Sequence, residues 1–492
     1  MRQLLLRLGK QSAVYGLSGA AIQLLGLITL PIYARAFTPA EYGVVEVAMV
    51  LFTAMIVAAD AGLGFAMQRN FYDGPDDRPE RRRVVTSTAT LGSTALALIL
   101  MVPVVLARRP IAEALFGDAS HADVVAYIGL AVPAGTLAVF LRDIMRLRFR
   151  AGHFAGSTVA STAVTAAIGV VWVTSFDGGV EAVAFGLLAG QVVGVLYGFA
   201  IVHADVALRF SWAEARSLVA LGLPLIPAGA ALWGMSFLDR LALSQLDGLA
   251  ATGEYAVGTR FASVLMFFTG ALGTAYTAFL FSLHASDPDA ERAVRVRLLT
   301  YASVFFVGVG LALALFAREV AQVVAPGYDR AHEVVGILCL GAAAFGLTPI
   351  TGAGISIMRR TDLAFKYTVA AVGLNCLLCL ALIPFLGAVG AATALAVPFI
   401  VLNYAYLRAS QRLAPVEFHV FRAVRVFVLG AALMPLGLLE LRSEGLSIAV
   451  KLLALAVFAA AVWVLRVFGH EERAELRRLA QQLRGRGAAA PA

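Results

Sequence analysis

The chain has 492 residues, of which 60% are hydrophobic and only 14% are charged. Soluble domains carry about 25% charged residues, so this composition excludes a soluble globular protein and indicates one that crosses a membrane many times. The formal net charge of +8 does not point to nucleic acid. The arginines lie in short loops between apolar runs, where they orient the chain in a bilayer.

Apolar runs, each near the ~20 residues that cross a bilayer, predict an all-α integral membrane protein with about fourteen transmembrane helices. The loops between them alternate in charge: one set holds 30 Lys and Arg, and the other holds 7. Because cytoplasmic loops are rich in Lys and Arg, we expect both termini in the cytoplasm. The runs lie near residues 12–34, 44–67, 84–107, 122–145, 156–176, 181–203, 217–239, 254–281, 296–316, 332–357, 363–385, 388–408, 421–440 and 446–468.

A short polar turn near the N-terminus recurs in the middle of the chain. Glu41-Tyr42-Gly43-Val44 precedes the second run, and Glu254-Tyr255-Ala256-Val257 stands 213 residues later, again at the start of an apolar helix. Repeats of this length indicate two similar halves, although a chance resemblance between apolar helices is the alternative. We predict pseudo-twofold-related six-helix lobes at 1–205 and 206–412. Two extra helices at 413–470 and a basic cytoplasmic tail at 471–492 would follow.

Charged residues inside apolar runs need an explanation, because each costs about 2.5–3.5 kcal/mol at mid-helix on insertion scales. Arg260 lies near the start of the eighth run among apolar neighbours. It either faces a wet central cavity and binds an anion or extends to the outer surface as an anchor, and we favour the cavity. Glu46 stands 214 residues earlier, at nearly the same place in the first half, so the two side chains could pair between the lobes.

Other charged residues have simple structural explanations beside functional ones. Asp60 is either a protonatable coupling group or a cap at the glycine-rich bend that follows it. Interfacial anchoring explains Arg69, a local ion pair explains Asp239 and Arg240, and membrane topology explains Arg35. The candidate substrate-binding residues are Arg260, Arg35, Glu46, Asp60, Arg69, Asp239, Arg240 and Tyr255.

Motifs of nucleotide hydrolysis, zinc proteases and serine hydrolases are absent from the sequence, and its seven histidines have no ligand spacing. We therefore expect no catalytic residue, no metal and no cofactor, and hence no enzyme. Transport would be driven by ion gradients, with the choice of H⁺ or Na⁺ open, or by the substrate itself. We expect a monomer that contacts membrane lipids but no nucleic acid.

Two groups of short segments, one in each half of the chain, carry a family resemblance. Val14-Tyr15-Gly16, Leu30 to Arg35 and Thr38 to Val44 resemble the opening of bacterial polysaccharide repeat-unit flippases, such as those for O-antigen. Leu238-Asp239-Arg240 and Gly253-Glu254-Tyr255 with Arg260 resemble the second-half signature. These flippases belong to the multidrug/oligosaccharidyl-lipid/polysaccharide exporter superfamily.

The resemblance implies a bacterial inner-membrane protein. It would move an undecaprenyl-diphosphate-linked oligosaccharide from the cytoplasmic to the periplasmic face by alternating access. It also implies a cationic cavity, to which Arg260 and Arg35 would contribute. Polysaccharide polymerase and export proteins are the expected partners.

Two alternatives come from other classes. A cation or drug antiporter of the same superfamily would be indicated by a cavity dominated by Asp60 and Glu46, with Arg260 pointing away. A membrane glycan polymerase or ligase would need a large outer loop, whereas the outer loops of this chain are short and poor in Lys and Arg.

Overall fold

The computed structural model describes residues 25–72, 79–176, 178–206, 209–439 and 443–465, together with residues 19, 23 and 467. Within these residues, eleven helices are long and apolar enough to cross a membrane. The protein is therefore an all-α, multi-pass membrane protein. The predicted helix at 12–34 is described only in part, and the predicted tail at 471–492 lies outside the described residues.

The first bundle consists of helices from the N-terminal half, and its α8 packs against both α6 and α7. Four glycines at every fourth position, from Gly186 to Gly198, line the buried face of α8. Small residues at this spacing let membrane helices approach closely. The bundle contains α2 (Pro39–Asp60), α3 (Leu63–Tyr72), α4 (Pro79–Leu106), α5 (Arg108–Phe116), α6 (Ala122–Leu147), α7 (Ala151–Ser175) and α8 (Glu181–Val202).

The second bundle is built around α14, which packs against α11, α12 and α17. The long α17 folds back on itself at Gly387, whose φ is 53°. Asn375 Nδ2 in its first half donates to the carbonyl of Ala394 in its second half at 2.8 Å. The helices are α10 (Ile226–Leu246), α11 (Leu249–Ser286), α12 (Pro288–Leu315), α13 (Ala317–Val324), α14 (Ala331–Gly346), α15 (Thr348–Thr351), α16 (Ala353–Ile357) and α17 (Thr361–Leu413).

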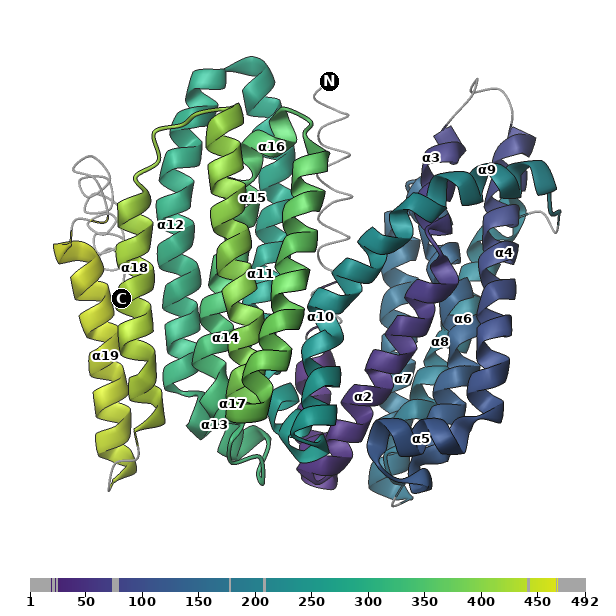
Figure 1. The fold of residues 1–492 in the computed structure, drawn as a ribbon, viewed down its shortest axis with the longest axis horizontal. Coiled ribbons are helices and arrows are strands. Elements are labelled where there is room, and N and C mark those ends of the chain that lie inside the picture. The colour runs from purple at the N-terminus through teal and green to yellow at the C-terminus, as the bar shows by residue number, and fades with distance from the viewer. Residues whose placement is uncertain are drawn as a thin grey trace, which may run out of the picture.

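Two further helices, α18 (Val420–Leu433) and α19 (Glu444–Val464), pack on α12 at the edge of the second bundle (Figure 1). Lys451 of α19 is buried, and its Nζ contacts Glu319 Oε1 of α13 at 2.5 Å. Partial burial acts to raise the pKa of Glu319, but the hydrogen bond from Lys451 helps to bring that pKa below its ordinary value. This ion pair fastens the last described helix to the bundle.

A surface helix, α9 (Trp212–Gly222), joins the two bundles. It packs against α3 and α4, and α10 then runs obliquely toward the second bundle (Figure 1). The chain between α2 and α3 is left-handed at Gly62, with φ 75°. A Cβ at Gly62 would meet the backbone of Gly222, and a Cβ at Gly222 would meet that of Gly62. We call this end of the molecule the linker end.

At the opposite end, which we call the crossing end, the first turns of α2 and α11 touch backbone to backbone. A Cβ at Gly43 would fall on the carbonyl oxygen of Leu249, and a Cβ at Gly253 would fall on that of Pro39. The Tyr328 hydroxyl donates to the carbonyl of Phe37 at 3.0 Å. The two bundles are thus in direct contact where both helices begin.

Candidate functional site

The start of α2 fixes which side chains face the second bundle. Thr38 caps the helix, Pro39 follows it, and the backbone N–H of Thr38 donates to Glu41 Oε2 at 2.8 Å. This capping box sets the helical register. Tyr42 and Glu46 are four residues apart, so they share one face of α2.

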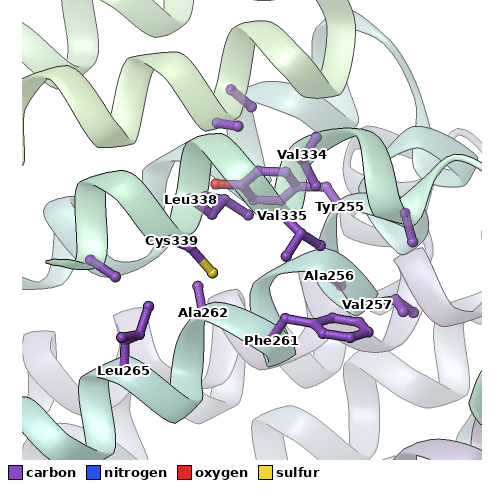
Figure 2. Close-up of a cluster of buried hydrophobic side chains, with 14 of the residues drawn as sticks. Tyr255, Ala256, Val257, Phe261, Ala262, Leu265, Val334, Val335, Leu338 and Cys339 are labelled. Atoms are coloured by element: carbon purple, nitrogen blue, oxygen red, sulfur yellow. The ribbon is translucent and has the colours of Figure 1, made fainter. Parts of the chain in front are cut away.

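The orientation of α11 follows from its packing on α14. Figure 2 shows buried side chains of α11, among them Tyr255, Ala262 and Leu265, clustered with Leu338 and Cys339 of α14. At 3.6 residues per turn, Arg260 lies nearly opposite this face. Packing against α14 therefore turns Arg260 toward α2.

Glu46 is paired with two arginines of the second bundle. Its Oε1 accepts from Arg260 Nη2 at 2.8 Å, and its Oε2 lies 3.2 Å from Arg240 Nε. The Glu46 side chain is 9% exposed and that of Arg260 is 37% exposed. The Tyr42 hydroxyl lies 3.5 Å from the same Nη2 of Arg260. One carboxylate of the first bundle thus bridges two guanidinium groups of the second.

Asp239 supplies the second carboxylate of this cluster. Its side chain is 1% exposed, and it accepts hydrogen bonds from the Tyr255 hydroxyl and from the backbone N–H of Arg240. Arg240 in turn donates to the carbonyl of Ser236 at 2.7 Å and contacts Thr259 Oγ1 at 3.3 Å. Two arginines and two carboxylates balance, as buried charges require unless they bind another ion.

Arg240 also lines a cavity of about 570 Å³ among α10, α11, α14 and α17. Thr259 and Ser263 lie with Arg240 on its wall, and Phe345 and Phe399 belong to its largely apolar remainder. Gln23 from the N-terminal segment also reaches this cavity. One guanidinium therefore joins the interface between the bundles to a pocket within the second bundle.

The structure brings five of the eight predicted site residues together and places three elsewhere. Asp60 caps α3, because its carboxylate accepts from the backbone N–H groups of Gly62 and Gly64 at 3.1 and 3.0 Å. Arg69 lies exposed on α3. Arg35 lies at the crossing end, where its Nη2 donates to the carbonyl of Val323 at 2.8 Å. For all eight residues, a role in substrate binding stays a prediction.

Two residues of the cluster were not predicted as site residues. Tyr42 contacts Arg260, and Thr259 contacts Arg240. Tyr42 had a signal in the sequence, because it is the repeat partner of Tyr255 and each of these hydroxyls reaches a charged group. Threonine is common in apolar helices, and nothing in the sequence distinguished Thr259 from the others.

These features define a class: a multi-pass membrane protein whose two helix bundles meet at a buried charge cluster beside a cavity. Residues 32–329 match the family described as "Polysaccharide biosynthesis protein". This match covers more than half of the chain, which therefore belongs to that family.

Individual related proteins and solved structures agree with this class. The chain is 23% identical over 386 residues to the "Probable low-salt glycan biosynthesis flippase Agl15" of Haloferax volcanii, covering 78% of each chain. Its fold is similar to that of the "Lipid II flippase MurJ, inward closed conformation", with a TM-score of 0.72, 14% identity and coverage of 93% of this chain and 100% of the other.

An inward-facing multidrug resistance MATE transporter of the MOP superfamily has the same fold, with a TM-score of 0.63 and 15% identity. That match covers 79% of this chain and 94% of the transporter. These relatives are flippases and transporters rather than enzymes.

Proposed function

We propose that this protein flips an undecaprenyl-diphosphate-linked oligosaccharide across the membrane by alternating access, for the export of a cell-surface polysaccharide. Its family and the naming of its Haloferax volcanii relative as a glycan biosynthesis flippase support a lipid-linked glycan as the substrate. The archaeal source of that relative leaves the bacterial inner membrane, and undecaprenyl as the carrier, as parts of the proposal.

The observation that carries the proposal is the pair of arginines on α10 and α11 that face α2 between the bundles. Guanidinium groups match phosphate oxygens in geometry and stay charged in a low-dielectric site. Arg240 also borders the cavity, whose hydroxyl and aromatic lining suits a polar, ring-containing group. The diphosphate would bind these arginines, and the polyprenyl chain would stay in the lipid.

The proposal includes an orientation. Fourteen transmembrane helices, with lobes at 1–205 and 206–412 and extra helices at 413–470, would place both termini in the cytoplasm. The crossing end would then face the periplasm and the linker end the cytoplasm. With the cell interior negative, outward movement of an anion is favoured by about 2.3 kcal/mol per charge per 100 mV. No nucleotide would be needed.

The geometry does not favour the cation antiporter. That alternative requires Asp60 and Glu46 to dominate a cavity, with Arg260 pointing away. Instead, Asp60 caps α3, Glu46 is paired with Arg260, and the charged residue on the cavity wall is Arg240.

Replacement of Arg260 tests the proposal. In cells that depend on this protein for surface polysaccharide, Arg260→Ala should abolish polymer export and leave lipid-linked oligosaccharide on the cytoplasmic leaflet. The matched control is Arg292→Ala, because Arg292 is an exposed arginine whose ion-pair partner, Asp289, is exposed as well. Polymer is measured on gels, and protein in the membrane by immunoblot. Normal export by Arg260→Ala at normal protein level would remove Arg260 from the site.

A further inference from the structure

We propose that Glu46 is an internal competitor of the substrate, a carboxylate that occupies the arginines until a phosphate group displaces it. This inference rests on the proposed function and adds a control mechanism to the same site. It begins from the pairing of one Glu46 carboxylate with guanidinium groups on two different helices.

The charge balance of the cluster requires such a displacement. Arg240 and Arg260 are matched by Glu46 and Asp239, so the cluster has no net positive charge for an anion. Asp239 is committed to Tyr255 and to the backbone of its neighbour. Glu46 belongs to the other bundle and is the carboxylate that can leave. Once it leaves, the two arginines exceed Asp239 by one charge, and an anion is attracted.

The geometry makes phosphate a suitable replacement. The two oxygens of Glu46 are each engaged by a separate guanidinium, at 2.8 Å and 3.2 Å. A phosphate group also presents several oxygens that accept hydrogen bonds from more than one arginine. Ligand and carboxylate therefore seek the same donors and cannot both occupy them fully.

Displacement also has a mechanical consequence, because the ion pairs of Glu46 join the two bundles. A ligand shifts a conformational equilibrium by its difference in affinity for the two states. A phosphate that binds only after Glu46 has left favours the state in which this tie is broken. Substrate binding and separation at the crossing end would then be one linked event.

Binding of farnesyl diphosphate to the full chain in lipid nanodiscs tests the competition, with farnesol as the uncharged comparison. Glu46→Gln should bind the diphosphate at least tenfold more tightly than the wild type, because the amide is a poor competitor. Glu46→Asp should show a smaller gain, because its shorter side chain does not span both arginines. Glu41→Gln is the matched control, because it loses the same charge while glutamine retains the capping box. The affinity of this variant for farnesyl diphosphate should equal that of the wild type.

Spin labels report the linked movement. Ala40 and Ala250 are exposed near the starts of α2 and α11, and both can be changed to cysteine after the three native cysteines are replaced. Farnesyl diphosphate should lengthen the distance between the labels in the wild type. In Glu46→Gln, the longer distance should already be populated without ligand.

The outcomes separate this inference from the proposed function. If Glu46→Gln binds farnesyl diphosphate no more tightly than the wild type, while Arg260→Gln loses binding, the competition is wrong and the arginine site stands. If the wild type, Glu46→Gln and Arg260→Gln all fail to bind the diphosphate better than farnesol, the proposed function fails as well.

Discussion

At the scale of single residues, the cluster persists because each buried charge has a partner. The Asp239 carboxylate is the most buried of the four charged groups. The Tyr255 hydroxyl is its hydrogen-bond partner from another helix. A buried acceptor that loses its donor pays its full desolvation cost. Tyr255 is itself fully buried, so no water from the surface can replace its hydroxyl directly.

Tyr255→Phe should therefore destabilise the protein by about 1–3 kcal/mol, since it removes one hydroxyl from Asp239 and leaves the ring packing in place. Thermal unfolding in detergent measures the effect as a lower midpoint. Tyr404→Phe is the control, because Tyr404 is an exposed tyrosine that accepts from Arg408. Equal midpoints for both variants would contradict the role given to Tyr255.

The residue pairs of the cluster differed in how well the sequence could predict them. The sequence offset between Glu46 and Arg260 allowed us to predict that they could pair, because repeated helices bring equivalent positions toward one axis. The second contact of Glu46, with Arg240, depends on the oblique course of α10 (Figure 1). Sequence spacing does not encode a tilt that arises from packing, so Arg240 was explained by a local ion pair with Asp239. That pair also exists, at 3.6 Å.

At the scale of helices, two breaks and the crossing of α2 with α11 lie at glycines, whereas the turns at Phe149 and Arg359 take positive φ without glycine. The bend after Asp60 and the break at Gly387 coincide with positive φ at glycines, and both sites were marked in the sequence by glycine among apolar residues. The contacts of Gly43 and Gly253 had no such signal. Each glycine allows a close approach to a carbonyl of a helix about 200 residues away, which a single sequence does not reveal.

Gly43→Val and Gly253→Val should hold the crossing end apart. The added side chain would meet a backbone carbonyl, which cannot rotate away as a flexible side chain can. The label distance between positions 40 and 250 should lengthen, and polymer export should fall. Gly373→Val controls for helix propensity, since a Cβ at Gly373 would meet no atom within 4 Å. An unchanged distance in both crossing-end variants would show that the first turns are not tightly packed in the membrane.

At the scale of the whole molecule, the low charge content and the long apolar runs predicted a multi-pass helical protein, and the fold confirms that class. The structure tests the predicted number of transmembrane helices less directly. The eleven long apolar helices count α17 once, although it folds back on itself. Fourteen transmembrane helices therefore remains a prediction.

Labelling from outside the cell tests the orientation. In a chain without native cysteines, Ser120→Cys lies at the crossing end and Asp289→Cys at the linker end, and both positions are exposed. A membrane-impermeant maleimide should label Ser120→Cys in intact spheroplasts, but Asp289→Cys only after permeabilisation. The reverse pattern would invert the proposed topology.

Because the backbones of Gly62 and Gly222 are in contact, the chain that leads into α10 is held at the linker end. A tilt about this contact would displace the far end of α10 most. Arg240 stands 18 residues beyond Gly222, which is roughly 27 Å of helix, so a tilt of about 10° would carry its Cα by about 5 Å. A small rotation beneath α9 is thus amplified into a displacement larger than any ion-pair distance in the cluster.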